Sequence, residues 1–200
     1  MKYIFSSIFI LVSFLSIAQA DSIIKQFDNR KNRLNHNGMI VLTSWASANI
    51  ISGSIGYALT KSEEEKNFHL MNASWGIVNL GIALPGLLAK EKTSATFYDL
   101  QKSQTQAEKL FLANAVLDVV YISGGFYLKS YANNQIDIKQ QYRFNGFGNS
   151  LIIQGAGLMV FDLAMTILNN RNRKKYLDPF FKKASISFTG NYIKLGYRFN

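Results

Sequence analysis

A chain of 200 residues suggests one domain, and a composition of 48% hydrophobic and only 17% charged residues is apolar for a soluble protein. The net charge of +10 favours contact with anionic lipid, nucleic acid or an acidic partner. Because the chain has no cysteine, disulfides, thiolate metal sites, a cysteine nucleophile and a lipidated cysteine are excluded, and two histidines argue against a multi-histidine metal site.

The first 20 residues, MKYIFSSIFILVSFLSIAQA, have the pattern of a secretory signal peptide. Lys2 supplies the positive charge, residues 4–17 form a short apolar run, and 18–20 is an A-x-A cleavage site. A first transmembrane helix is the alternative, but the run is shorter than the roughly 20 residues that a span requires. We therefore expect cleavage after Ala20.

Residues 21–37 form a leader between this segment and the first long apolar window. Ile23, Ile24, Phe27 and Leu34 would share one side of a helix. The leader is therefore interpreted either as an amphipathic helix on the membrane surface or as a solvated segment.

Four long windows are almost free of charged residues, and each has about the length that crosses the ~30 Å hydrocarbon core of a bilayer. They predict helices at about 38–59, 69–89, 108–128 and 148–169. A soluble four-helix bundle would need a charged outer face on each helix, which these windows lack. The sequence therefore predicts an all-α fold, a four-helix transmembrane bundle over 38–170.

Polar and small residues gather into one stripe per helix, at 3.6-residue spacing. SWASAN (44–49) and SWGIVN (74–79) repeat the same Ser, Trp and Asn positions, and Ser52 extends the first stripe. In a bilayer such stripes face other helices while the apolar faces meet lipid. The predicted polar core, a binding candidate, consists of Trp45, Asn49, Asn72, Trp75, Asn79, Asn114, Asp118, Gln154 and Asp162.

The polar core has a structural and a functional interpretation. Asn and Gln side chains between membrane helices commonly form interhelical hydrogen bonds of about 0.6–2 kcal/mol each. Asp118 and Asp162 are the sharpest functional candidates, because an ionisable group inside a membrane helix is a functional hypothesis by default. Burial disfavours the charged form of a carboxyl group, so this pair would suit proton sharing or cation binding.

Local signals add expectations at the helix ends. Pro85 predicts a kink near 81–86. GFGNS (146–150) has no preceding strand that would make a phosphate loop, so it is interpreted as the turn before the fourth helix, with Ser150 among its caps. No catalytic triad spacing, metal-ligand cluster or cofactor motif is present. We therefore assign no catalytic residue, no metal and no cofactor.

A basic segment and an alternating segment occupy residues 171–200. The basic segment supplies a predicted lipid-surface anchor, formed by Arg171, Arg173, Lys174 and Lys175. Nucleic acid is the alternative, which export would disfavour. Pro179 is expected to end any helix. The alternation in ASISFTGNYIKLGYRFN, with a Gly190-Asn191 turn, predicts a short C-terminal β-hairpin at about 184–198.

Signal cleavage followed by four spans conflicts with the distribution of charge. Sixteen Lys and Arg residues of the mature chain would lie outside the cytoplasm and five inside, which opposes the positive-inside rule. The first segment could be a retained anchor, or the helices could assemble in the inner membrane against the rule. They could also be too polar to stop in the translocon, which would place the bundle in the periplasm or outer membrane. A multi-pass inner-membrane protein is the preferred expectation.

Three strings carry a resemblance to a family: HLMNASWGIVNLGIA (69–83), LANAVLDVVYISGGFYL (112–128) and SLIIQGAGLMVFDLAMTIL (150–168). They resemble an uncharacterised family of bacterial envelope proteins with four predicted transmembrane helices, over about residues 36–170. The resemblance implies this architecture and no activity.

The sequence thus predicts a non-enzymatic envelope membrane protein with a structural or interaction role. Its expected partners are membrane lipids and an envelope protein or a second copy of the chain, not nucleic acid. The alternative is a small transporter or ligand-binding bundle that uses the inward Asn and Asp side chains.

Overall fold

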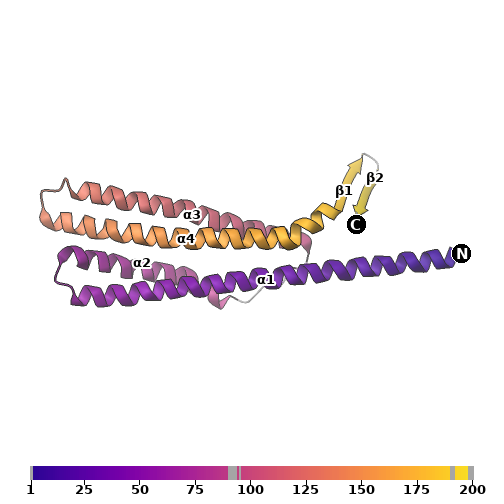
Figure 1. The fold of residues 1–200 in the computed structure, drawn as a ribbon, viewed down its shortest axis with the longest axis horizontal. Coiled ribbons are helices and arrows are strands. Elements are labelled where there is room, and N and C mark those ends of the chain that lie inside the picture. The colour runs from indigo at the N-terminus through magenta and orange to yellow at the C-terminus, as the bar shows by residue number, and fades with distance from the viewer. Residues whose placement is uncertain (1, 90–93, 95, 190–191, 198–200) are drawn as a thin grey trace. The chain divides into compact units, whose positions relative to one another are not determined.

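The computed structural model describes the backbone of residues 2–89, 94, 96–189 and 192–197, and the side chains of 22–89, 94 and 96–179. The elements of this described part are α1 (Lys2–Leu59), α2 (Glu63–Leu88), α3 (Phe97–Ala132), α4 (Ile138–Lys183), β1 (Ala184–Thr189) and β2 (Tyr192–Tyr197) (Figure 1). The two strands pair antiparallel, with Phe188 opposite Ile193. The predicted Gly190-Asn191 turn lies outside the described residues.

The chain divides into two compact units. Unit 1 comprises residues 1–33, 91–107 and 168–200, and unit 2 comprises residues 34–90 and 108–167. Unit 2 therefore contains parts of all four helices and the whole predicted polar core. Within it α1 lies beside α2, and α3 beside α4 (Figure 1).

Glycines bring the helices of unit 2 into close contact. A Cβ atom on Gly76 of α2 would stand 2.8 Å from the carbonyl oxygen of Ala46 in α1. Likewise, a Cβ atom on Gly125 of α3 would stand 2.7 Å from the carbonyl oxygen of Gly148 in α4. No side chain fits at these distances, so glycine is what allows the backbones to approach, as in many membrane helix pairs.

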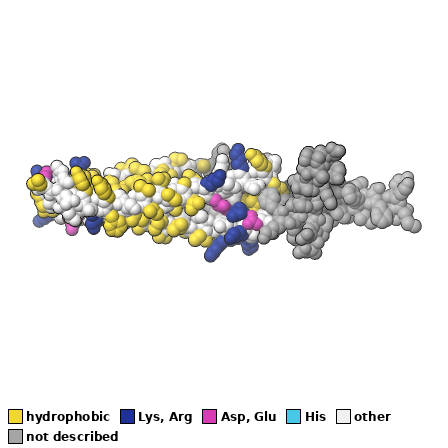
Figure 2. Space-filling model, turned by 90° about the horizontal axis from the view of Figure 1, so that it is seen from above, with side chains coloured by type: hydrophobic (Ala, Val, Ile, Leu, Met, Phe, Trp, Pro, Cys, Tyr) yellow, Lys and Arg dark blue, Asp and Glu magenta, His cyan; other side chains and the backbone are white. Residues whose placement is uncertain are grey.

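The helices carry their apolar side chains outside and several polar side chains inside. Large hydrophobic residues are exposed on every helix of unit 2, among them Ile51, Ile77, Val120 and Val160. Figure 2 shows hydrophobic side chains spread over this surface, with charged side chains at the end where α1 meets α2. This arrangement reverses that of a soluble bundle, whose outer face is polar.

Four described helical segments are long and apolar enough to cross a membrane: Ser22–Leu59, Glu63–Leu88, Phe97–Ala132 and Ile138–Pro179. The 26 residues of α2, at about 1.5 Å each, reach about 39 Å, which exceeds the ~30 Å hydrocarbon core. The prediction of an all-α, four-helix fold with candidate membrane spans is confirmed at this level.

All four helices begin earlier than predicted, and caps explain the starts of α2, α3 and α4. Ser62 starts α2, because its hydroxyl accepts from the Glu65 backbone N–H at 3.4 Å. Thr96 starts α3, because its hydroxyl accepts from the Asp99 backbone N–H at 3.1 Å and donates to the Asp99 carboxylate at 2.7 Å. Asp137 starts α4 by accepting from the Lys139 backbone N–H at 2.9 Å. GFGNS therefore lies inside α4, and its interpretation as a turn was wrong.

The predicted effect of Pro179 on the helix was also wrong, since α4 continues to Lys183. Leu177 is buried against Phe27 and Leu100, and Arg173 pairs with Asp178 at 3.2 Å. This tertiary packing outweighs the one backbone hydrogen bond that proline removes. α2 likewise stays helical through Pro85 to Leu88, and a kink there remains a prediction.

Two further expectations for α1 need correction. Ser52 was expected to face inward but is exposed, and its hydroxyl donates to the Ala48 carbonyl of its own helix at 2.6 Å instead of to another helix. The leader at 21–37 is helical, and Phe27 within it is fully buried, so a solvated leader is excluded. α1 also runs without a break through the predicted cleavage site, and cleavage remains a prediction.

Candidate functional site

Gln154 of α4 is the centre of a hydrogen-bond network inside unit 2. Its side-chain oxygen accepts from the indole N–H of Trp45 at 3.1 Å. Its side-chain nitrogen donates to Asn49 at 2.6 Å and to Asn72 at 3.0 Å. These bonds join α1, α2 and α4 through four predicted polar-core residues, so here the polar stripes hold the helices together.

Ser150 completes this network, although sequence reasoning placed it only at a helix start. Its fully buried hydroxyl donates to the side-chain oxygen of Asn72 at 2.6 Å. Ser150 stands four residues before Gln154, on the same face of α4. Helical spacing could therefore have identified it once the true start of α4 was known.

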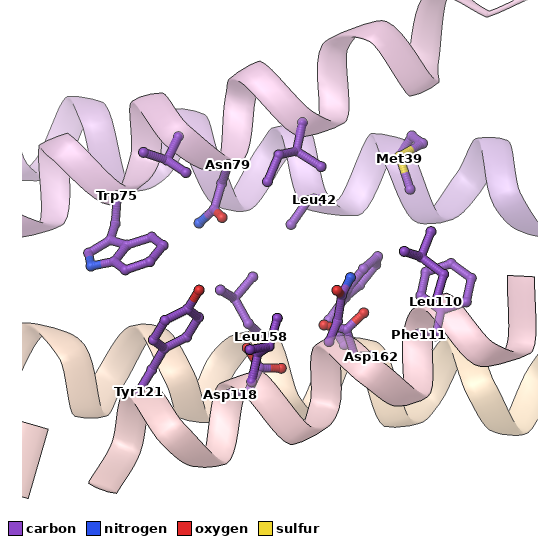
Figure 3. A pocket seen from close by; sticks show the side chains of 15 residues that line it. Met39, Leu42, Trp75, Asn79, Leu110, Phe111, Asp118, Tyr121, Leu158 and Asp162 are labelled. Atoms are coloured by element: carbon purple, nitrogen blue, oxygen red, sulfur yellow. The ribbon is translucent and has the colours of Figure 1, made fainter. Parts of the chain in front are cut away.

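The other five polar-core residues line a separate cavity of about 230 Å³. All four helices contribute to its wall, and the predicted residues on it are Trp75, Asn79, Asn114, Asp118 and Asp162. Figure 3 shows Asn79 projecting from α2 towards the space above Asp118 and Asp162. The structure thus divides the predicted core into a bonded network and a cavity lining.

The polar side of the cavity carries two carboxyl groups in mutual contact. The carboxyl groups of Asp118 on α3 and Asp162 on α4 interact with each other, and Asn114 lies beside Asp162. A hydrogen bond between two carboxyl groups requires a proton on one of them, because two carboxylates offer only acceptors. Asp118 and Asp162 are 2% and 4% exposed, so water solvates them poorly.

Several polar atoms of this lining have no partner within the described structure. They are the Oδ2 atom of Asp118, the Oδ1 atom of Asp162 and the Nδ2 atom of Asn79. Asn79 is only 3% exposed. Buried polar atoms are normally hydrogen-bonded, so these three leave hydrogen-bonding capacity unused at the cavity.

The rest of the lining is apolar and reaches the outer surface between α2 and α3. Val78 and Ile82 of α2, and Leu110 and Leu117 of α3, line the cavity and are also exposed. Trp75 contacts Tyr121 at one end of the lining, with ring centroids 4.8 Å apart. The cavity therefore has a polar interior and an apolar opening on the face that would meet lipid.

No metal centre is apparent in the described part of the chain, where no three His, Asp or Glu side chains come together. The predicted lipid-surface anchor lies in unit 1, where Arg171, Lys174 and Lys175 are exposed. Arg173 differs, because its guanidinium donates to Asp178 at 3.2 Å and to Asn170 at 3.2 Å. Three of the four predicted anchor residues are thus accessible.

Unit 1 also contains a buried ion pair that sequence reasoning missed. The Lys31 ammonium group lies 3.0 Å from the Asp28 carboxylate and 2.8 Å from the Ser103 hydroxyl. The other Asp28 oxygen accepts from the Ser94 backbone N–H at 2.5 Å. Opposite charges three residues apart were the available signal, but such pairs are usually solvated on a helix surface.

These features define a four-helix protein with candidate membrane spans, an internal amide network and a cavity that contains two acidic side chains. The chain belongs to a family of unknown function (DUF6992), which matches residues 41–163 and hence most of unit 2. The predicted membership of an uncharacterised family is confirmed, while its bacterial and envelope character remains a prediction. Comparison with curated proteins and with solved structures finds no match.

Proposed function

We propose that this protein is a non-enzymatic membrane protein that binds a small apolar molecule with a polar head group in the cavity of unit 2. The supporting observation is the cavity itself, which contains Asp118 and Asp162 and opens on the apolar face between α2 and α3. A cavity that includes both Asp residues and reaches a surface is the feature that distinguishes a ligand-binding bundle from a purely structural one. This cavity favours the ligand-binding bundle, which was the alternative, over the structural role that the sequence alone placed first.

The dimensions of the cavity fit this proposal. Ligand sites in proteins are mostly apolar, with a few convergent polar groups that fix orientation. Here the wall is mostly apolar, and Asn79 faces Asp118 and Asp162 across the cavity (Figure 3), with Asn114 beside Asp162. About 230 Å³ accommodates a head group and the first part of a chain, with the remainder extending through the opening.

A structural or interaction role remains the second candidate, and the Gln154 network supports it. Those side chains bond to one another, so they rigidify the bundle without needing a ligand. In this case the β1–β2 hairpin would be the contact element, since a two-stranded sheet alone is marginally stable and gains from docking on a partner. A membrane protein, a second copy of the chain or lipid would then be the partner.

The location belongs to the same proposal. We place the protein in the cell envelope, exported by the signal-like segment at 1–20 and inserted in the inner membrane. The four candidate spans and the accessible cations Arg171, Lys174 and Lys175 support this placement, because cations beside a span bind anionic head groups. The outer membrane and the periplasm are the alternatives.

Photolabelling tests the binding proposal. The purified protein, in phosphatidylcholine nanodiscs, is labelled with a long-chain alcohol that carries a diazirine, and the modified peptides are mapped. We expect saturable labelling of the cavity-lining stretch 110–121, reduced by unlabelled dodecanol and by the cavity-filling variant Leu158→Phe. Labelling that is unsaturable and equal at lipid-facing positions such as Ile51 would contradict a binding cavity.

A further inference from the structure

We propose that the ligand of this cavity is an amphiphile whose head group carries a protonated amine, held by Asp118 and Asp162 and reached through the opening between α2 and α3. The inference rests on the proposed binding function and adds the chemical class of the ligand. It combines three observations: the charge of the lining, the orphaned atoms and the position of the opening.

The charge of the cavity lining favours a cationic ligand. Asp118 and Asp162 contact each other through their carboxyl groups, and the pair keeps one negative charge when it shares one proton. Among the described residues that line the cavity, none is Lys, Arg or His. A buried carboxylate without a partner either takes up a proton or needs a cation, and a cationic head group supplies the positive charge that the lining side chains do not.

The orphaned atoms define the geometry of that head group. Asp118 Oδ2 and Asp162 Oδ1 are unpartnered acceptors, which suit the several N–H donors of an ammonium group. Asn79 supplies an unpartnered donor on the opposite wall, and it projects into the same space (Figure 3). An oxygen atom beside the amine, as in an amino alcohol, would accept from the Asn79 amide.

The position of the opening makes the ligand an amphiphile rather than an inorganic cation. Val78, Ile82, Leu110 and Leu117 form an apolar path from the exposed surface to the acidic pair. A hydrated ion would lose its water along this path without compensation. An alkyl chain, in contrast, would remain in contact with the path and with lipid beyond it.

Quenching of Trp75 by brominated probes tests the inference. Trp75 lines the cavity, and the substitution Trp45→Phe leaves it as the sole tryptophan of the chain. The protein, in phosphatidylcholine nanodiscs without anionic lipid, is titrated with 6-bromohexylamine, 6-bromohexanol and 6-bromohexanoic acid, which share one chain length and keep the bromine within the cavity. We expect saturable quenching by the amine at a concentration at least tenfold lower than for the acid.

Matched substitutions test whether the preference for the amine depends on Asp118 and Asp162. Asp118→Asn and Asp162→Asn should each reduce the preference for the amine at least tenfold, whereas Asp137→Asn, on an exposed loop, should leave it unchanged. Size-exclusion chromatography establishes that each variant is folded. If Trp45→Phe fails to fold, the wild-type protein with Trp75→Phe as its unquenched control gives the same comparison.

Asn79 provides an independent check. A 6-bromohexyl chain ending in an N-hydroxyethyl amine should bind about fivefold more tightly than the simple amine, because its hydroxyl satisfies the Asn79 donor. Asn79→Leu should abolish this difference.

The outcomes separate the two levels of the proposal. Saturable quenching by all three probes alike, sensitive to Leu158→Phe, would overturn the amine inference while the binding function stands. Absence of saturable quenching by any probe would overturn both. If millimolar Na⁺ or K⁺ displaces the amine from the cavity in a saturable manner, the ligand is an inorganic cation and the amphiphile is ruled out.

Discussion

Single side chains of the amide network illustrate how polar groups stabilise a bundle whose outer surface is apolar. In water such groups would exchange one hydrogen-bonding partner for another, but inside a membrane bundle an unpaired amide has no solvent to contact. Gln154 satisfies Trp45, Asn49 and Asn72 at once. Substitution of this residue is therefore expected to remove hydrogen bonds to three other side chains at once.

Gln154→Leu keeps the volume of the side chain and removes its three hydrogen bonds. At about 0.6 kcal/mol or more for each bond, we expect the free energy of unfolding to fall by about 2 kcal/mol. Unfolding of the purified protein by a denaturing detergent, followed by circular dichroism, measures this loss. The control Gln140→Ala, on the exposed surface of the same helix, should change stability little; equal effects of the two would show that the network contributes no stability.

The buried ion pair of unit 1 should be sensitive to the loss of one partner. Asp28→Ala leaves the Lys31 ammonium group buried without its carboxylate and leaves Ser94 without its acceptor. We expect unit 1 to lose about 3–5 kcal/mol of stability, and protease cleavage within 96–107 to become faster. The neighbouring exposed variant Asn29→Ala is the control, and unchanged cleavage in Asp28→Ala would contradict a buried pair.

At the scale of helices, the close crossings of unit 2 depend on residues without side chains. Gly125 and Gly148 face each other at a distance that excludes a Cβ atom, whereas the neighbouring Gly124 has no atom within 4 Å of its Cβ position. Two adjacent glycines in α3 thus serve different purposes. The sequence alone gives no reason to expect different roles for Gly124 and Gly125.

Alanine at these two positions should act in opposite directions. Gly124→Ala should be neutral or stabilising by up to about 1 kcal/mol, because alanine is the better helix former. Gly125→Ala should destabilise by about 1–3 kcal/mol, because its methyl group would collide with the Gly148 carbonyl. Thermal unfolding midpoints in detergent compare the two, and equal shifts would argue against the close α3–α4 crossing.

At the scale of the whole chain, the location proposed for the protein fixes which loops are accessible from outside the cytoplasm. Ser185→Cys follows α4 and Asn133→Cys precedes it, so a spanning α4 places the two positions on opposite sides of the membrane. With an exported N-terminus and four spans, Ser185→Cys should react in intact cells with a maleimide that cannot cross the inner membrane. Asn133→Cys should react only after lysis.

The chain has no cysteine of its own, so this labelling has no background within the protein. The reverse pattern, with position 133 labelled and position 185 protected, would mean that the first segment is retained as an anchor. The basic segment that contains Arg171, Lys174 and Lys175 would then face the cytoplasm, in agreement with the positive-inside rule.

The number of helices followed from the charge-free windows and the inward polar stripes from the 3.6-residue spacing, but most of the helix ends followed from neither. The charge-free windows identified where four helices lie, because charges are costly in an apolar core. The start of α4 at Ile138 and its continuation through Pro179 were not predicted, since an Asp137 cap and the burial of Leu177 decide them. Local signals compete with tertiary contacts at helix ends, and the contacts prevailed here.

By itself, the sequence determined most of the residues that face inward, because the 3.6-residue period assigns each side chain to one face of its helix, although Ser52 is exposed. Only the tertiary structure decided which inward residues meet. The rotation and axial offset of the helices, set by the glycine crossings, bring Gln154 to Asn49 and Asn72 and leave Asn79 facing an open space beside Asp118 and Asp162. Periodicity contains no information on these offsets, and so the cavity and its unpartnered atoms became visible only once the four helices were assembled.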